Sequence, residues 1–213
     1  MERAIARILM EIGAVSLRAD PPFQWASGRF APIYCDNRLI MSHPEKRIAV
    51  AEAFVRAIEA RGWTPEVIAG TATAGIPHAA WVAHLMSLPM VYVRGAAKGH
   101  GKENRIEGAL EKGRRVVLIE DLISTGGSSL EAAAALVEAG AALEGLAAIF
   151  TYGLPTAAKR FAEARVDFTA LSSFGALMDE SLAQGALGAA QKAIIADWQR
   201  DPGAWSAQRG GAA

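Results

Sequence analysis

Glu120 and Asp121 stand side by side at the end of an apolar run, and a turn rich in small residues follows them. The turn comprises Ser124, Thr125, Gly126, Gly127 and Ser128, and the residues after it are typical of a helix. Free backbone N–H groups at a helix start bind anions, most naturally a phosphate group. Carboxylates accept hydrogen bonds from the vicinal hydroxyl groups of a sugar. The pattern therefore indicates a site for a ribose 5-phosphate, whereas simple helix capping by Ser124 or Thr125 leaves the acid pair unexplained.

A second candidate element is the basic, glycine-containing loop at residues 92–108. It concentrates five basic side chains in a chain whose 22 Lys+Arg and 22 Asp+Glu residues balance: Arg94, Lys98, His100, Lys102 and Arg105. Cations on a glycine-rich loop suit a diphosphate leaving group, with closure of the loop excluding water. The alternative is a solvated surface loop without a ligand.

A third loop, "GTATAGIPH" at residues 70–78, also joins a predicted strand to a predicted helix. Pro77 falls in the first turn of that helix, where its missing N–H group costs nothing. The backbone N–H groups around Thr71, Thr73 and Ala74 are suited to a second phosphate group. Taken alone, this loop is a weak signal.

Short apolar runs alternate with helical patterns along most of the chain, and these elements must position the three loops. Strands are predicted at residues 66–71, 90–94, 114–121, 142–152 and 167–173, and helices at residues 43–62, 75–87, 127–140 and 155–164. The alternation predicts an α/β fold with a parallel sheet covered by helices on both faces. Ligands of such sheets bind at the carboxyl ends of the strands, where all three loops fall.

The two ends of the chain carry less regular patterns. Residues 2–13 predict an amphipathic helix, residues 29–40 a strand with polar ends, and residues after about 175 a helical tail. The final "RGGAA" is expected to be frayed. Residues 94–113 are expected to form one long polar loop, which in a compact domain usually acts as a functional lid.

The composition favours a single globular domain of 213 residues, with 52% hydrophobic and 21% charged residues. The balanced charge predicts no general attraction for nucleic acid or for an anionic membrane. Cys35 is the only cysteine, which excludes an internal disulfide and a Cys-based zinc cluster and favours a reducing, cytoplasmic location. The N-terminal residues do not resemble a signal peptide, and no uncharged apolar run reaches about 18 residues, so no membrane partner is expected.

The sequence "VVLIEDLISTGGS", residues 116–128, resembles the ribose-phosphate signature of the type I phosphoribosyltransferases. The loop "YVRGAAKGHGKENRIEG", residues 92–108, and the early segment "FQWASGRFAPIYCDNR", residues 23–38, resemble the orotate phosphoribosyltransferases in particular. The three motifs occur in the order expected of that family, and the likeness runs from about residue 23 to residue 152.

The resemblance implies an α/β, type I phosphoribosyltransferase fold, with a mainly parallel five-stranded sheet flanked by helices. It implies a single domain, residues 1–213, in which residues 1–43 contribute a hood over the base site. The implied reaction is the reversible, Mg²⁺-dependent transfer of ribose 5-phosphate from 5-phosphoribosyl 1-diphosphate to orotate, which gives orotidine 5′-phosphate and diphosphate in UMP biosynthesis. The resemblance also implies a homodimer in which the loop at residues 94–110 reaches the neighbouring site.

By the same resemblance, Lys98, His100 and Asp121 are the expected catalytic residues. The expected binding residues for 5-phosphoribosyl 1-diphosphate come from the three loops: Thr71, Thr73, Ala74, Arg94, Lys98, His100, Lys102, Glu120, Asp121, Leu122, Ile123, Ser124, Thr125, Gly126, Gly127 and Ser128. Orotate is expected to contact Ser124, Ser27 and Gly28. Mg²⁺ would be held mainly by the substrate, near Asp121, without a metal site built from protein ligands alone.

Three positions lack a basic residue that many members of the family carry, namely Ala26, Ala74 and Gly95. The remaining cations of the basic loop, Lys98, His100 and Lys102, would then carry more of the charge of the leaving group.

Two other functions remain open at the level of sequence. One is a phosphoribosyltransferase that acts on a purine or on uracil, and the segment at residues 23–38 argues against it because that segment is the orotate-type element. The other is a regulator that senses phosphoribosyl diphosphate and acts on nucleic acid. The balanced charge and the single N-terminal amphipathic helix argue against this regulator. A nonenzymatic scaffold would leave the basic loop unexplained.

Overall fold

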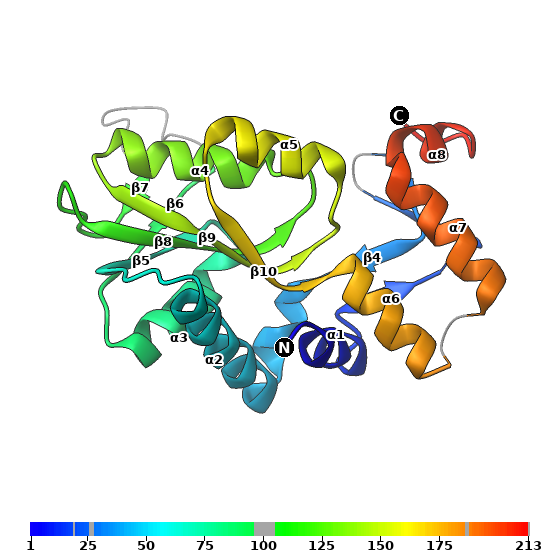
Figure 1. Ribbon diagram of the computed structural model, residues 1–213, viewed down its shortest axis with the longest axis horizontal. Helices are drawn as coiled ribbons and strands as arrows, with labels where there is room; N and C mark the ends of the chain where they lie inside the picture. Colours follow the sequence, from blue (N-terminus) through cyan, green and yellow to red (C-terminus); the bar gives the residue numbers. More distant parts are fainter. Residues whose placement is uncertain (19, 26–27, 96–104, 186–187, 213) are drawn as a thin grey trace.

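The structure, a computed structural model, describes residues 1–18, 20–25, 28–95, 105–185 and 188–212, and these residues contain a six-stranded β-sheet between two layers of helices (Figure 1). The strand order across the sheet is β10-β9-β8-β5-β6-β7. The strands are β5 (Val67–Thr71), β6 (Met90–Val93), β7 (Ile106–Glu107), β8 (Arg115–Ile123), β9 (Ala142–Thr151) and β10 (Phe168–Ser173).

Five of these strands run parallel, and β7 is a short addition at the edge. Neighbouring strands from β10 to β6 pair in parallel, whereas β7 pairs antiparallel with β6. The predicted mainly parallel α/β sheet is confirmed, with six strands in place of the expected five. The prediction of an unbroken polar loop over residues 94–113 is wrong at β7, because Ile106 and Glu107 pair with Val93 and Tyr92.

The strand order determines where a ligand site can form. β5 lies between β6 and β8, so the chain leaves β5 toward one edge of the sheet and later returns to its other side as β8. At such a switch point a crevice opens outside the carboxyl ends of the strands. Thr71 is the last residue of β5, and Glu120 and Asp121 lie near the carboxyl end of β8, so two of the predicted loops lie side by side.

Side chains of the central strands alternate between two cores. In β8, Val117 and Ile119 pack into the core on one face of the sheet, and Val116 and Leu118 pack into the core on the other. All four are fully buried, because helices cover both faces. Figure 1 shows α2 (Pro44–Ala60) and α3 (Gly75–Met86) below the sheet, with α4 (Gly127–Glu138) and α5 (Pro155–Ala164) above it.

Helix starts follow local signals in the sequence. Pro44 and Pro155 occupy the first turns of α2 and α5, where a missing N–H group breaks no intrahelical bond. α4 begins after Gly126, whose φ is +77°, and a Cβ atom there would lie 2.7 Å from Phe161 Cε2. Glycine alone tolerates both this backbone conformation and such a close approach, so residue 126, in the turn from β8 into α4, must be glycine. Over the described ranges, no helix is long and apolar enough to cross a membrane.

Both ends of the chain build a smaller lobe beside the sheet (Figure 1). Its elements are α1 (Glu2–Glu11), β1 (Val15–Leu17), β2 (Phe23–Gln24), β3 (Phe30–Ala31), β4 (Ile33–Cys35), the 3-10 helix η1 (Asn37–Ser42), α6 (Phe174–Ala183), α7 (Ala189–Arg200) and α8 (Pro202–Ala207). β1 pairs with β4 and β2 with β3, both antiparallel. Arg3 and Arg7 of α1 form ion pairs with the buried Glu180 of α6, at 3.1 and 2.7 Å, and so join the two ends of the chain.

Two sequence predictions are wrong in this lobe. Residues 29–40, predicted as one strand, form β3, β4 and η1, because Pro32 has no N–H group for a ladder and the Asp36 side chain caps the start of η1. The glycine-rich terminal residues, predicted to be frayed, are held in place: Ala212 N donates a hydrogen bond to Gly28 O at 3.1 Å.

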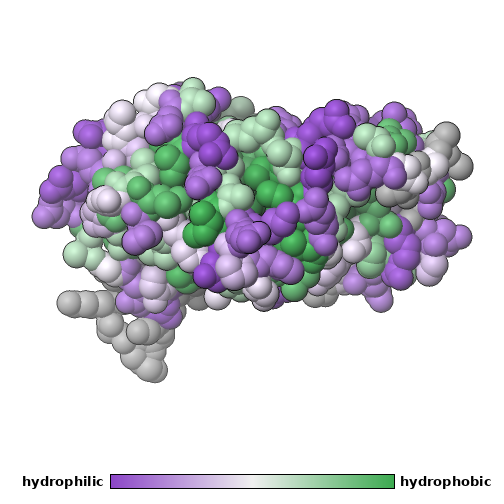
Figure 2. Space-filling model, turned by 90° about the horizontal axis from the view of Figure 1, so that it is seen from below, coloured by the Kyte–Doolittle hydropathy of each residue, from purple (hydrophilic) through white to green (hydrophobic). Residues whose placement is uncertain are grey.

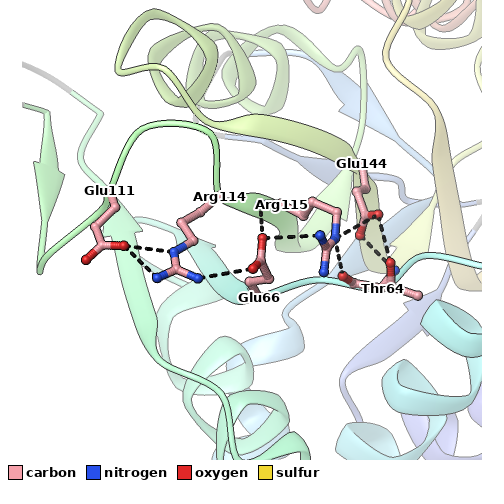
Figure 3. Close-up of polar contacts among 6 residues, drawn as sticks. All are labelled: Thr64, Glu66, Glu111, Arg114, Arg115 and Glu144. Carbon is pink, nitrogen blue, oxygen red and sulfur yellow. Dashed lines mark hydrogen bonds and ion pairs between the residues drawn. The ribbon is translucent and has the colours of Figure 1, made fainter.

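A ladder of charged side chains lies at the amino ends of β5, β8 and β9, the end of the sheet away from the acid pair (Figure 3). Arg114 bonds Glu111 at 2.6 Å and Glu66 at 3.1 Å, and Arg115 lies 3.4 Å from Glu66 and 3.9 Å from Glu144. The arginine side chains are nearly half exposed, so water weakens each pair. The ladder joins three strands at the surface and does not reach the predicted site.

Candidate active site

The acid pair, Glu120 and Asp121, lies at the carboxyl end of β8. The carboxylate of Glu120, the first of the two, already accepts hydrogen bonds from neighbouring protein groups. Glu120 is only 6% exposed. Thr71 Oγ1 donates a hydrogen bond to Glu120 Oε1 at 2.6 Å, and Ser129 Oγ donates one to Oε2 at 2.9 Å. The backbone N–H group of Asp121 donates to Oε1 as well, at 3.0 Å. Glu120 therefore joins β5, β8 and α4 through its carboxylate.

Asp121, in contrast, lines a pocket and is half-buried. Burial, together with a hydrogen bond to Glu120 and the charge of that neighbour, raises the pKa of Asp121 to about 7. A carboxylate in this position favours any ligand that supplies positive charge or hydroxyl donors, because either stabilises its ionised form. The geometry thus makes Asp121 the ligand-facing member of the pair.

A polar pocket of about 270 Å³ opens at the switch point between β5 and β8. Its described lining comes from the ends of β5, β6 and β8, the ends of the basic loop and the start of α4: Thr71, Ala72, Thr73, Ala74, Val93, Arg94, Gly95, Arg105, Glu120, Asp121, Leu122, Ser128, Glu131 and Ala132. Two members of this lining, Arg94 and Arg105, carry positive charge, whereas the acid pair carries negative charge. Predicted binding residues from all three loops meet here, namely Thr71, Thr73, Ala74, Arg94, Glu120, Asp121, Leu122 and Ser128.

The turn at residues 124–126 carries the chain from this pocket into α4. The described lining of the polar pocket includes Ser128 but not Thr125, Gly126 or Gly127. The Ile123 side chain is fully buried, and Ile123 O accepts a hydrogen bond from Tyr152 N at 3.1 Å. What this turn can offer a ligand is therefore the set of backbone N–H groups at the start of α4, because these groups have no hydrogen-bond acceptors within the helix.

The basic loop begins and ends at a paired stem. Arg94 N donates to Arg105 O at 2.8 Å, and Arg105 Nε donates to Arg94 O at 3.1 Å. Arg94 also forms an ion pair with Glu107 of β7 at 3.4 Å. The stem holds both ends of the loop at the rim of the polar pocket. The predicted loop residues Lys98, His100 and Lys102 lie outside the described residues.

A second, aromatic pocket of about 220 Å³ adjoins the polar one through Leu122, which lines both. Its described lining is Trp25, Tyr34, Cys35, Leu122, Ser124 and Tyr152. The Trp25 and Tyr152 rings are stacked, with centroids 5.5 Å apart and planes inclined by 26°. The aromatic faces, together with the hydroxyl groups of Ser124, Tyr34 and Tyr152, suit a flat ring with polar substituents.

Two residues of the N-terminal lobe were predicted to bind the base. Ser27, like Ala26, lies outside the described residues. Gly28 lies in the turn of the β2–β3 hairpin (residues 23–31) with φ at +81°, and its N–H group donates to Trp25 O at 2.8 Å. Gly28 thus contacts Trp25 of the aromatic pocket and is not itself part of the described lining.

Asn37 connects the lobe to the acid pair. Its side chain is 1% exposed, and Nδ2 donates a hydrogen bond to Asp121 O at 2.7 Å. Its Oδ1 accepts a hydrogen bond from Cys35 Sγ at 3.3 Å. Burial raises the pKa of the Cys35 thiol, so the thiol keeps its proton and remains a donor. One amide therefore fixes a wall of the aromatic pocket relative to β8.

Four residues of this site are not expected from the sequence motifs, namely Trp25, Asn37, Ser129 and Tyr152. Tyr152 directly follows β9, and residues just past the carboxyl ends of parallel strands commonly line a ligand site, so this signal was present. Trp25 and Asn37 fall inside the recognised segment at residues 23–38. Ser129 has no comparable signal, because only the tertiary structure brings its hydroxyl group to Glu120.

Metal-binding capacity at this site rests on few protein groups. In the part of the chain that the structure describes, no cluster of three or more His, Cys, Asp or Glu side chains is arranged to hold a metal ion. Among the described lining residues, the acids of the polar pocket are Glu120, Asp121 and Glu131, and Glu120 already accepts hydrogen bonds from two hydroxyl groups.

Comparison with known proteins agrees with this geometry. The phosphoribosyl transferase domain family matches residues 39–182. The orotate phosphoribosyltransferase of Listeria innocua is 49% identical over 205 residues, covering 96% of this chain and 98% of that protein, and that of Bacillus cereus is 50% identical over 202 residues, covering 95% and 96%. The crystal structure of orotate phosphoribosyltransferase from Aeropyrum pernix superimposes with a TM-score of 0.74 at 27% identity, over 86% of this chain and 99% of that one. The chain belongs to the orotate phosphoribosyltransferase family.

Proposed function

We propose that this enzyme catalyses the reversible transfer of ribose 5-phosphate from 5-phosphoribosyl 1-diphosphate to orotate, giving orotidine 5′-phosphate and diphosphate on the route to UMP. The observation that carries the proposal is the meeting of the polar and aromatic pockets at Leu122. The polar pocket suits a phosphorylated sugar and the aromatic pocket a planar base. A ribose between them would present its C1 atom to both.

The reaction breaks the bond between ribose C1 and a diphosphate oxygen and forms a bond from C1 to the orotate ring nitrogen. The diphosphate leaves with the bonding electron pair, and the deprotonated ring nitrogen supplies the pair for the new bond. Positive charge therefore builds on the sugar in the transition state. The Asp121 carboxylate, next to the ribose, stabilises this charge and accepts hydrogen bonds from ribose hydroxyl groups. No covalent bond to the protein is required.

The phosphate groups are assigned to the three loops. The turn at residues 124–128 holds the 5′-phosphate by the N–H groups at the start of α4, and the loop at residues 71–74 contributes to the diphosphate subsite. Arg94 and Arg105 line the same pocket and offset the negative charge of the leaving group. Lys98, His100 and Lys102 of the basic loop are assigned to the leaving group as well.

The polar pocket fits Mg²⁺ carried by the diphosphate. The acid pair and Glu131 would otherwise face a highly charged anion, and a divalent cation between them relieves the repulsion. Asp121 is the residue that would contact the metal or its water shell, because its raised pKa falls when a cation is bound. When bound, Mg²⁺ neutralises charge on the departing diphosphate and keeps most of its oxygen ligands from substrate and water.

The N-terminal residues 1–43 form the hood over the base site within a single domain, residues 1–213. Trp25, Tyr34 and Cys35 of this segment supply half of the lining of the aromatic pocket, which supports the assignment. Ser124 reaches the same pocket from the end of β8 and is assigned to the orotate ring. Ser27 and Gly28 are assigned to the adjoining part of the base site.

A cytoplasmic location is proposed from cysteine usage. Cys35 is the only cysteine of the sequence, and its buried thiol donates a hydrogen bond to Asn37, a role that requires the reduced form.

A homodimer is proposed, with the face carried by η1, α2 and α3 as its contact surface. This face bears exposed apolar side chains: Leu39, Met41, Ile48 and Leu85. Figure 2 views the molecule from that side and shows hydrophobic areas between hydrophilic ones. α3 begins directly after the loop at residues 71–74, so a second copy bound here would lie beside the polar pocket. Met41→Glu and Leu85→Glu should each shift the protein to monomers in sedimentation velocity.

Complementation tests whether the loop at residues 94–110 reaches the neighbouring site. Lys98→Ala and Asp121→Asn subunits are mixed, so that mixed dimers make up about half of the population after random exchange. If the loop is shared, both lesions fall in one site and the other site is intact. Activity then recovers toward about a quarter of the unmodified level. No recovery, with mixed dimers shown to form, assigns Lys98 to its own subunit.

The assay that tests the proposed function follows the loss of orotate absorbance when 5-phosphoribosyl 1-diphosphate and Mg²⁺ are supplied. Uracil and hypoxanthine run beside orotate as competing bases, and omission of Mg²⁺ is the metal control. Consumption of uracil or a purine at least as efficiently as orotate would overturn the choice of base and leave the broader reaction class standing.

A further inference from the structure

The C-terminal segment, residues 202–212, lies against the β2–β3 hairpin (Figure 1). Ser206 Oγ in α8 accepts a hydrogen bond from Phe30 N at 2.9 Å, and Ala212 N donates one to Gly28 O at 3.1 Å. Ser206 is fully buried, so its hydroxyl group has been taken out of water for this contact. Both bonds end on the backbone of the hairpin, where they fix its position whatever side chains the hairpin carries.

The contact requires a glycine at residue 211. A Cβ atom added to Gly211 would lie 2.5 Å from Ser206 Oγ, 2.8 Å from Phe30 Cδ2 and 3.1 Å from Phe30 N. All three distances are shorter than van der Waals contact, so any larger residue forces the segment away from the hairpin. The double glycine at residues 210–211 thus permits close packing at its second position.

Behind the hairpin lies a cavity of about 470 Å³, lined by Asp20, Pro21, Pro22, Phe30, Ile194 and Arg209. A well-packed core fixes a segment through many small contacts, and a cavity supplies none on its side. Beside this cavity, therefore, the two hydrogen bonds from the C-terminal segment and the close approach of Gly211 to Phe30 hold the hairpin in place.

The other side of the hairpin faces the aromatic pocket. Gly28 N donates to Trp25 O at 2.8 Å, and Trp25 N donates to Arg29 O at 2.8 Å, so the turn and Trp25 move together. The Trp25 ring stacks on Tyr152 and contacts the edge of Trp198 in α7, with ring centroids 6.1 Å apart. A displacement of Gly28 is transmitted to Trp25 and hence to the lining of the aromatic pocket.

We infer that the C-terminal segment is a positioning element for the base: through Gly28 and Phe30 it sets the place of Trp25 and so the affinity for orotate. The inference rests on the proposed function, which assigns the aromatic pocket to the base. The described lining of the polar pocket contains no residue from 202–212, so the affinity for 5-phosphoribosyl 1-diphosphate should not depend on this segment.

Three variants test the inference: Gly211→Val, Ser206→Ala, and a chain that ends at Gly210. Gln208→Ala is the matched control, because Gln208 is exposed in the same segment. The KM for orotate should rise about 3- to 10-fold in each variant, which corresponds to the loss of one or two ordinary hydrogen bonds. The KM for 5-phosphoribosyl 1-diphosphate and the kcat at saturating orotate should stay within about twofold, and the control should match the unmodified protein.

The outcomes separate this inference from the proposed function. If the unmodified protein does not consume orotate, the assignment of the aromatic pocket fails and the inference fails with it. If the unmodified protein is active and the variants keep its KM for orotate, the positioning role alone is wrong. An equal rise in both KM values, or a loss of kcat alone, would show a general structural role and overturn it too. Should Gly211→Val not fold, the milder Ser206→Ala and the shortened chain decide the question.

Discussion

The side chain of Asn37 donates a hydrogen bond to the backbone oxygen of Asp121 at 2.7 Å, and it accepts one from Cys35. A residue of the N-terminal lobe thereby holds the strand that carries the acid pair. Asn37→Ala should remove the hydrogen bonds to Asp121 O and to the Cys35 thiol, which costs on the order of 1–3 kcal/mol. We expect kcat/KM to fall about tenfold for both substrates, measured in steady-state kinetics.

Lys46→Ala is the control for Asn37, because Lys46 forms an exposed ion pair with Glu11 that also joins the lobe to α2. It should retain nearly the unmodified kcat/KM. An Asn37→Ala enzyme with unmodified kinetics would show that the hydrogen bond does not position the acid pair.

Asp121→Asn should lower kcat on the order of 100-fold, because the amide cannot offer negative charge to the developing cation on the sugar. Glu131→Gln is a matched control: Glu131 lines the same pocket from α4, but its side chain is exposed. Its kcat should change little. Near-normal turnover in Asp121→Asn would remove Asp121 from the catalytic role.

The raised pKa of Asp121 gives a prediction for stability. The pKa is about 7 in the folded protein and 3.8 for an ordinary aspartate, so the unfolded chain binds the proton less tightly. The stabilising effect of that proton is fully present below about pH 4 and is lost as the pH rises through 7. Asp121→Asn has no carboxyl group at this position and so does not lose stability in this way as the pH rises. In calorimetric scans, the Tm of this variant should exceed that of the unmodified protein most at pH 8 and least at pH 4. An advantage that grows toward low pH would contradict the raised pKa.

Arg94→Ala should raise the KM for 5-phosphoribosyl 1-diphosphate about tenfold or more and leave the KM for orotate nearly unchanged. Arg94 lines the polar pocket, and a charge-assisted hydrogen bond to phosphate is worth about 1.5–3 kcal/mol. Glu107→Gln removes the carboxylate that pairs with Arg94 and keeps the Arg94 guanidinium. This control should therefore bind 5-phosphoribosyl 1-diphosphate at least as well as the unmodified protein. A larger defect in Glu107→Gln than in Arg94→Ala would mean that the ion pair, and not the cation, is what the site needs.

The charged ladder of Figure 3 should matter for stability but not for catalysis. Arg115→Gln removes contacts to Glu66 and Glu144, and Tm should fall by no more than about 4 °C at low salt. In 1 M NaCl the difference should shrink, because salt screens exposed charges. Lys159→Gln, which breaks a single exposed pair with Glu163, should have a smaller effect. A change in kcat for Arg115→Gln would place the ladder in communication with the site.

The parallel strands can be predicted from the sequence because burial on both faces leaves a plain signal. In β5 all five residues are buried, and its run of apolar and small side chains is hard to interpret otherwise. β7 leaves no such signal, because two residues are too few to show a period. It forms because the edge of β6 offers free backbone groups, and that information lies in the neighbouring strand.

The location of the candidate site can be predicted from the sequence, and the division of roles inside it cannot. Strand ends of a parallel sheet meet at one edge, so the three loops had to converge. Glu120 and Asp121, however, are equivalent in a sequence pattern. The tertiary structure brings the hydroxyl groups of Thr71 and Ser129 to Glu120, and both donate hydrogen bonds to its carboxylate. These contacts distinguish Glu120 from Asp121.

Glycine at the end of the chain misled the sequence prediction for a related reason. A glycine-rich end usually indicates disorder, because glycine gains the most entropy on unfolding. Gly211 instead allows an approach to Phe30 that no side chain would permit. A sequence does not distinguish these two uses of glycine, since the difference lies in the partner surface.

The bond between Gly28 and Ala212 also sets an order of events during synthesis. The strands of the central sheet lie between residues 67 and 173 and can pair while the rest of the chain is still being translated. The hairpin at residues 23–31 is translated long before residue 212, yet it gains the hydrogen bond to Gly28 O only from that residue. A nascent chain therefore completes the lining of the polar pocket, residues 71–132, well before its aromatic pocket reaches its final form, and its KM for orotate should reach the value of the full chain only once translation has passed that residue.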